Sequence, residues 1–161
     1  MGSLSSVPDG WGLVWKDRHG HAYDEPVFRY LLALERTRSA RLGVPLLLLL
    51  VEQSPSAPRI ATTHAFRLFS VLSACTRETD IVGWHRRDRV AGVAITELGD
   101  SSLAEVSALL QAKVAAALGR GLPGAVPYHV YARIHGRPRP ARSIGEAADV
   151  GAGESECSIS A

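Results

Sequence analysis

Charged residues whose side chains could bind a ligand are concentrated between positions 77 and 89. Arg77 and Asp80 stand three positions apart, and a tetrapeptide at 86–89, with three arginines and one aspartate, follows after five further residues. Hydrogen bonds between such groups are strong because the donor or the acceptor is ionised. The pair therefore suits a binding site, and it equally suits an exposed turn between a helix and a strand, which contributes little energy. The tetrapeptide suits a solvated hairpin tip or a contact surface for a partner or a phosphate.

The chain before position 77 predicts a helix, a buried strand and a second helix. Asp24 can act as an N-cap, Pro26 falls in the first turn, and Gly43 ends the helix. The leucine run at 46–50 lacks polar alternation, which is typical of a strand covered on both faces. Residues 61–76 place apolar side chains three and four positions apart, as a second helix would. The two apolar faces consist of Val27, Phe28, Leu31, Leu32 and Leu34, and of Ala65, Leu68, Phe69 and Leu72.

A hairpin, a third helix and a last strand follow the charged pair. Residues 81–84 and 90–95 are rich in strand formers and flank the tetrapeptide, which predicts a β-hairpin with a polar tip. A third amphipathic helix is expected between the serines at 101–102 and the glycines at 119 and 121. Residues 126–134 alternate enough to form a last strand. The order helix, strand, helix, hairpin, helix, strand predicts an α/β fold with a mixed sheet flanked by helices.

Length and composition set the limits of this organisation. A chain of 161 residues, 46% of them hydrophobic and 21% charged, suits one globular domain. We expect a folded domain at 24–136, preceded by a segment at 1–23 whose role the sequence leaves open. A short piece at 11–15 of that segment could be an edge strand. Residues 137–161 lack apolar periodicity, so we expect a flexible tail there.

Several classes of protein are excluded by the composition. A net charge of +2 gives no support to a general nucleic-acid binder, and the longest apolar run is too short to span a bilayer. Cys75 and Cys157 have no partner spacing, which argues against a disulfide framework or a zinc site and favours a reducing cytoplasm. The histidines are accompanied by no ligand cluster at metal spacing, so we expect no metal site.

From position 77 to 90 the sequence resembles the GGDEF family of bacterial diguanylate cyclases. Members of that family carry Arg-x-x-Asp, five further residues, and then the Gly-Gly-Asp/Glu-Glu-Phe signature at a hairpin tip. Arg77 and Asp80 fall on the Arg-x-x-Asp at the same spacing. The resemblance also takes in residues 34–51 and extends loosely to 136. The signature positions are occupied by Arg86, Arg87, Asp88, Arg89 and Val90.

The departures from the family's pattern imply a degenerate domain that is not an enzyme. In active cyclases the two glycines let the backbone approach the GTP phosphates, which Arg86 and Arg87 prevent. Asp88 matches the first acid of the signature, but Arg89 replaces the second. Glu52 is the nearest match to the family's metal-binding aspartate, and its longer side chain is an imperfect substitute. The stretch at 53–63 lacks the family's guanine-binding asparagine and aspartate. We therefore expect no catalytic residues and no cofactor.

The resemblance implies a binding function for the residues that survive. In the family, Arg-x-x-Asp forms the core of an inhibitory site for cyclic di-GMP. An arginine fork can donate to guanine O6 and N7, while a carboxylate can accept from N1 and N2. Arg77 and Asp80 are therefore the expected ligand-binding pair. Arg86 and Arg87 are the candidates for the additional arginine that such sites often recruit.

The sequence thus predicts a non-enzymatic signalling domain of the bacterial cytoplasm that acts as a cyclic di-GMP receptor. Such receptors are often employed to regulate exopolysaccharide machinery, which implies a protein partner or a homodimer. The alternative is a ligand-independent module for protein interaction or dimerisation that keeps a dead cyclase fold.

Overall fold

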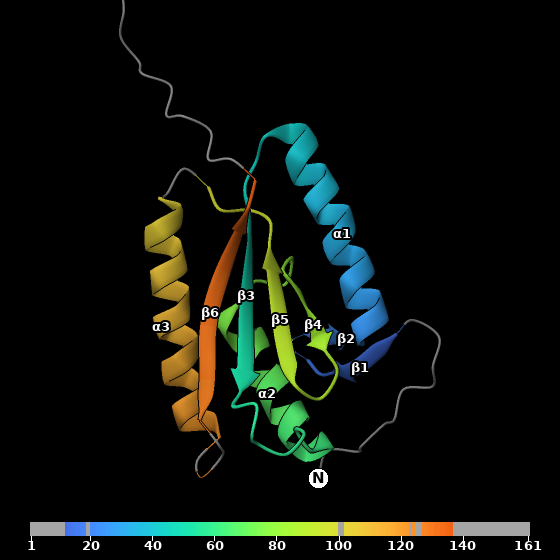
Figure 1. Ribbon diagram of the computed structural model, residues 1–161, viewed down its shortest axis with the longest axis vertical. Coiled ribbons are helices and arrows are strands. Elements are labelled where there is room, and N and C mark those ends of the chain that lie inside the picture. The colour runs from blue at the N-terminus through green and yellow to red at the C-terminus, as the bar shows by residue number, and fades with distance from the viewer. Residues whose placement is uncertain (1–11, 19, 100–101, 123, 125–126, 137–161) are drawn as a thin grey trace, which may run out of the picture.

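The computed structural model describes residues 12–18, 20–99, 102–122, 124 and 127–136. These residues form one mixed sheet of six strands with three helices (Figure 1). The strands lie in the order β1-β2-β4-β5-β3-β6. In chain order the elements are β1 (Leu13–Lys16), β2 (His21–Tyr23), α1 (Glu25–Leu42), β3 (Leu46–Gln53), α2 (Thr62–Cys75), β4 (Ile81–Arg86), β5 (Val90–Ile95), α3 (Leu103–Gly121) and β6 (Tyr128–His135).

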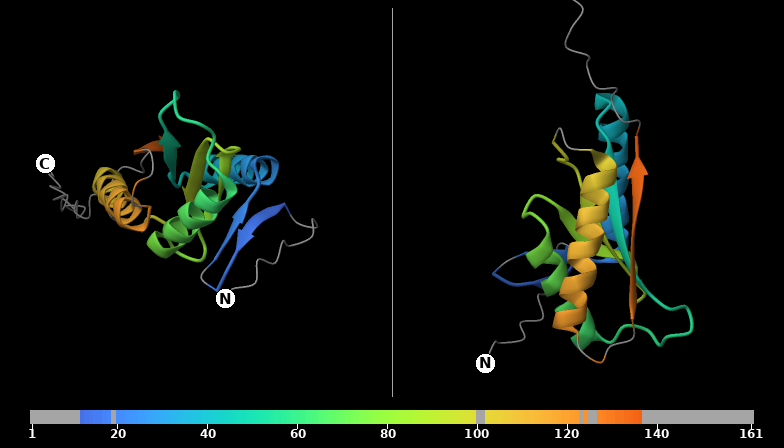
Figure 2. Two further views of the ribbon diagram at one scale, coloured as in Figure 1. Left: turned by 90° about the horizontal axis from the view of Figure 1, so that it is seen from below. Right: turned by 90° about the vertical axis from the view of Figure 1, so that its left-hand side faces the viewer.

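The centre of the sheet is the leucine-rich strand β3, which pairs antiparallel with both β5 and β6. Its first six residues are all buried, because helices cover both faces of the sheet around it. Leu47, Leu49 and Val51 belong to the core under α2 and α3. Leu46, Leu48 and Leu50 belong to the core under α1. Figure 2 shows α2 and α3 on one side of the sheet and α1 on the other.

Helix α1 has both of the expected terminal signals. The Asp24 side chain accepts a hydrogen bond of 3.1 Å from the Val27 backbone N–H, which satisfies one of the free donors of the first turn. Gly43 adopts a left-handed conformation with φ of 63° at the C-cap. Phe28 and Leu32 are buried, but Leu34 is 49% exposed. The prediction for Leu34 was wrong because it lies two positions from Leu32, and residues two apart do not share a helix face.

Two glycines make room for α1 to pack on the sheet. Gly83 and Gly92 are direct cross-strand partners on β4 and β5, and the ring of Phe28 lies over both of them. A Cβ atom on Gly92 would come within 2.7 Å of the ring, and one on Gly83 within 2.6 Å of the Tyr23 carbonyl oxygen. This glycine pair thus lets the aromatic ring and the β2 backbone approach the sheet closely.

The expected elements are present with shifted ends, the possible edge strand at 11–15 is observed as β1, and β2 is an added strand. Strand β4 continues to Arg86, two residues beyond the prediction. Ser102 stands at the N-cap of α3, but its side chain makes no capping hydrogen bond. Part of the N-terminal segment forms the β1–β2 hairpin, which joins the sheet through parallel pairing of Tyr23 with Gly83.

Two further expectations concern the C-terminal tail and membrane-spanning helices. The predicted tail at 137–161 lies outside the described residues. In the part of the chain that the structure does describe, no helix combines the length and the apolarity needed to cross a membrane.

Candidate functional site

The four predicted ligand-binding residues lie at the two ends of β4. Arg77 and Asp80 stand in the turn between α2 and β4, whereas Arg86 ends the strand and Arg87 begins the turn to β5. Asp80 and Arg86 are six positions apart in extended chain, which corresponds to about 20 Å. The structure therefore brings Arg77 together with Asp80, and Arg86 together with Arg87, but it does not join the two pairs.

Hydrogen bonds within the turn fix Arg77 and Asp80 relative to each other. The Arg77 backbone N–H donates to Asp80 Oδ2 at 2.8 Å, and the Asp80 N–H donates to the Arg77 carbonyl at 3.0 Å. The exposed Arg77 side chain reaches across to the segment after β5, where Nη1 donates to the Glu97 carbonyl at 3.1 Å. The aspartate is thus held by its own turn, while the guanidinium group lies at the surface.

Burial dominates the electrostatics of Asp80. Desolvation raises the pKa of its carboxyl group above the usual 3.8, against the smaller lowering effects of the Arg77 N–H and the Arg77 charge. The charge of Glu97 raises this pKa further. A carboxylate in such a setting gains from additional hydrogen-bond donors, because they stabilise its ionised form.

The β1–β2 hairpin lies against one side of the turn that carries Arg77 and Asp80. The sequence did not predict this contact. Gly20 and His21 line a recess with Ser73, Arg77 and Asp80. A Cβ atom on Gly20 would meet the Ser73 hydroxyl oxygen at 2.8 Å, which is too close for a larger residue without movement. The free volume of the recess is about 10 Å³, enough for a single water molecule.

At the other end of β4, the hairpin tip is held by backbone contacts. Asp88 has φ of 56°, and the Arg89 N–H donates to the Arg86 carbonyl at 3.1 Å. The Ile60 N–H donates to the Asp88 carbonyl at 2.9 Å, and Arg89 Nη1 donates to the Ala57 carbonyl at 2.7 Å. The connection between β3 and α2 therefore packs against the tip and orients Arg89.

A cleft of about 430 Å³ lies beside the tip and carries an excess of positive charge. Both acidic residues of its lining accept hydrogen bonds from neighbouring groups. Glu25 Oε2 accepts from the Arg87 N–H at 2.8 Å, and Glu52 Oε2 accepts from the Tyr131 hydroxyl at 3.2 Å. The residues that line the cleft are Glu25, Glu52, Gln53, Pro55, Arg59, Arg86, Arg87 and Arg89.

The acid at the tip faces arginines instead of further acids. Asp88 Oδ2 lies 4.0 Å from Arg59 Nη1 and 3.9 Å from Arg87 Nε. Among the described residues, no group of three or more histidine, cysteine, aspartate or glutamate side chains is placed to hold a metal ion. The four arginines that line this cleft can therefore bind anionic groups.

Comparison with protein-family profiles and with curated proteins gave no match. Among solved structures, the chain is similar to the crystal structure of a DGC (diguanylate cyclase) protein from Thermotoga maritima. The TM-score is 0.56 and the sequence identity 16%, over 71% of this chain and 82% of that one. This likeness confirms the predicted fold class, an α/β fold with a mixed sheet and flanking helices like that of a diguanylate cyclase.

Proposed function

We propose that this chain is a degenerate, non-catalytic GGDEF-like domain that binds cyclic di-GMP at Arg77 and Asp80. The observation that carries the proposal is the hydrogen-bonded turn at 77–80, which holds an aspartate beside an exposed arginine on a fold like that of a diguanylate cyclase. The role that follows is that of a receptor in bacterial cyclic di-GMP signalling.

The chemistry of the turn suits one guanine base. A guanidinium group has five N–H donors, and the structure assigns one Nη1 contact of Arg77 to the Glu97 carbonyl. Its remaining donors can serve guanine O6 and N7. Asp80 uses Oδ2 for the Arg77 backbone, so Oδ1 can accept from guanine N1 or N2. The two side chains together can therefore recognise a single base edge.

The ligand must approach the Arg77–Asp80 turn from its solvent-exposed side. The recess shared with Gly20 and His21 holds no more than a water molecule. Arg77, in contrast, is exposed. We therefore place the base over the outer side of the guanidinium group, with the β1–β2 hairpin as its neighbour.

The non-catalytic part of the proposal rests on the hairpin tip. Arg86 and Arg87 stand where the GGDEF signature has glycines, and Arg89 stands where it has an acid. The acid that remains, Asp88, faces Arg59 and Arg87. A tip with this charge pattern lacks both the close backbone approach and the paired acids that the cyclase reaction uses.

Isothermal titration with cyclic di-GMP tests the receptor function, with GTP as the control ligand. We expect micromolar or tighter binding that Arg77→Ala and Asp80→Ala each weaken by about 1–3 kcal/mol, roughly five- to 150-fold. Arg67→Ala is the matched control, because Arg67 is an exposed arginine on α2 away from the turn. Unimpaired binding by Arg77→Ala would overturn the proposal. An absence of heat and of thermal shift at high ligand concentration would leave a ligand-independent interaction domain.

A separate assay tests the absence of cyclase activity. The purified protein is incubated with GTP and Mg²⁺ or Mn²⁺, and the nucleotides are separated by chromatography. We expect the GTP to remain unconverted. Formation of cyclic di-GMP above the level of a protein-free control would contradict the non-catalytic assignment without affecting the binding test.

A further inference from the structure

Four exposed arginines from three elements converge on one side of the sheet. Arg29 and Arg36 come from α1, Arg86 from the end of β4 and Arg133 from β6. All four are close enough to His85 for their charges to act on it. We call this surface the basic face and define it by Arg29, Arg36, His85, Arg86, Arg133 and His135.

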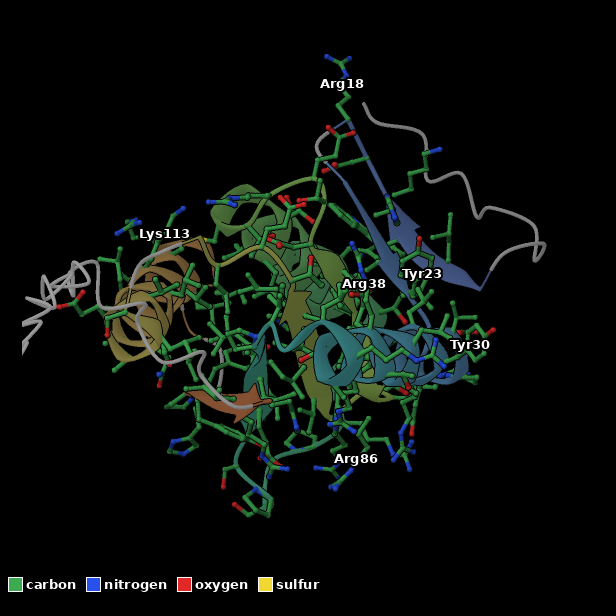
Figure 3. All side chains as sticks on the ribbon, turned by 90° about the horizontal axis from the view of Figure 1, so that it is seen from above. Arg18, Tyr23, Tyr30, Arg38, Arg86 and Lys113 are labelled. Carbon is green, nitrogen blue, oxygen red and sulfur yellow. The ribbon has the colours of Figure 1, made fainter. Side chains whose placement is uncertain are left out.

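Strand register places the β6 members of this face beside α1. Arg133 and His135 are the partners of Leu48 and Leu46, which belong to the core under α1. Alternate β6 residues such as Val130 pack on the opposite core. Figure 2 shows that α1 lies toward β2 and β4 instead of over β6. In Figure 3, Arg86 extends into the space that this leaves beside α1.

Two of the arginines on this face contact neighbouring rings. Arg36 Nη2 lies 3.2 Å from His135 Nε2, and the Arg133 guanidinium carbon lies 5.8 Å from the Tyr131 ring centre. Burial lowers the pKa of His85 and of His135, and neighbouring arginines lower both further. Because a guanidinium stays charged, His135 accepts the Arg36 contact through a neutral ring nitrogen.

Few acidic groups balance these charges. Glu25 Oε1 pairs with Arg29 at 3.1 Å, and Glu52 holds the Tyr131 hydroxyl. Within the described ranges, Arg36, Arg86 and Arg133 form no salt bridge with a carboxylate. Three neighbouring cations thus lie at the surface without a carboxylate partner among the described residues, an arrangement that a partner with several negative charges would stabilise.

We propose that the basic face binds an extended acidic segment of a partner protein, which adds to the sheet along β6. The six residues are spread over the surface of three elements, α1, β4 and β6, whereas small ligands bind mostly in concave sites. Among the described residues β6 is an edge strand, since it pairs with β3 alone. The free backbone groups of such an edge can bind an extended peptide, whose carboxylates would reach Arg133 and Arg36.

Charge also decides between this occupant and two others. A second copy of the chain paired antiparallel along β6 would bring like-charged Arg133 side chains toward each other, which is unfavourable. A nucleic acid would meet Glu25 and Glu52 at the margin of the face, and the net charge of +2 gives little general attraction. A protein segment, unlike a nucleic acid, can carry its negative charges at selected positions, opposite the arginines and away from Glu25 and Glu52. The proposal is independent of nucleotide binding at Arg77.

The test uses a fluorescent peptide of about eight residues with alternating glutamate and threonine, titrated with the full chain at low salt. We expect saturable binding that the double variant Arg36→Glu/Arg133→Glu weakens by about tenfold or more. The matched control is Arg38→Glu, because Arg38 pairs with Glu35 and lies on the other side of α1 from Arg86 in Figure 3. This control should bind within about twofold of the wild type. Circular dichroism verifies that each variant is folded.

Three outcomes would overturn the proposal. Equal weakening by Arg38→Glu would indicate nonspecific attraction, and tighter binding of an oligothymidylate at the same arginines would indicate a nucleic-acid site. Unchanged amide exchange of β6 on peptide binding would contradict addition to the strand edge. Arg77→Ala should leave peptide binding unchanged, and the double variant should leave cyclic di-GMP binding unchanged. The two proposals can therefore fail separately.

Discussion

The backbone N–H of Arg87 donates a hydrogen bond of 2.8 Å to the carboxylate of Glu25, 62 positions earlier in the chain. The other oxygen of that carboxylate accepts from Arg29 at 3.1 Å. Glu25 thus connects the tip of the β4–β5 hairpin to the first turn of α1. Glu25 is therefore one of the side chains that fix the tip arginines relative to the helix.

Replacing Glu25 tests that connection. Glu25→Ala removes the acceptor of the Arg87 N–H, so we expect the free energy of unfolding to fall by about 0.5–1.5 kcal/mol. Chemical denaturation measures this change. Glu35→Ala is the control, because Glu35 makes only a 3.7 Å surface pair with Arg38, and we expect at most a small effect from it. Equal effects of the two variants would contradict a special role for Glu25.

Substitution of Gly92 tests the packing of Phe28. A Cβ atom at this position would lie 2.7 Å from the aromatic ring, so Gly92→Ala should destabilise the protein by about 1–3 kcal/mol in thermal or chemical unfolding. Gly119→Ala provides a control of opposite sign. Nothing lies within 4 Å of a Cβ atom there, and alanine favours the α3 helix by about 0.5–1 kcal/mol. Stabilisation by both variants would refute the close approach of the ring.

His85 should make stability depend on pH. Burial and the nearby arginines lower its pKa in the folded state below the usual 6.5. Between the two values the unfolded chain binds more protons, so the free energy of unfolding falls as the pH drops below about 6.5. Denaturation at a series of pH values should give a steeper loss for the wild type than for His85→Gln. His64→Gln, on the exposed side of α2, should keep the wild-type dependence.

Asp80 should make cyclic di-GMP binding depend on pH in the same direction. Burial raises its pKa in the free protein, whereas guanine N–H donors would stabilise the carboxylate in the complex. Binding therefore releases a proton near that pKa, so affinity should rise with pH and level off once the carboxyl group of the free protein is ionised. Titration calorimetry in buffers of different ionisation enthalpy measures the released proton. Tighter binding at lower pH would argue against contact with ionised Asp80.

Much of the fold was accessible from the sequence because the signals are local. The unbroken leucines of β3 are buried on both faces, and Asp24 and Gly43 cap α1 as their residue types predict. The β1–β2 hairpin was harder to predict, because β2 has only three residues and joins β4 through the Tyr23–Gly83 pair. So short a strand has no periodicity that could indicate its neighbour.

The candidate sites were predictable only in part, for a similar reason. The spacing of Arg77 and Asp80 identifies a turn, and the turn is formed by bonds between those same residues. The bond from Arg77 to Glu97 and the contact of Arg36 with His135 join residues 20 and 99 positions apart. Nothing in the local sequence indicates such pairs, since they arise where the α2–β4 turn meets the segment after β5 and where α1 meets the end of β6. The basic face therefore became visible only in three dimensions.

The facing glycines under Phe28 constrain the order in which this sequence can diverge. An alanine at Gly92 meets the ring while Phe28 is present, but a smaller side chain at position 28 would remove that obstacle. The same substitution is thus harmful in one background and tolerable in another, because residues in contact do not contribute additively. Homologues that have lost the glycine at 92 should accordingly carry a smaller residue at 28, so the two positions should vary together over evolutionary time.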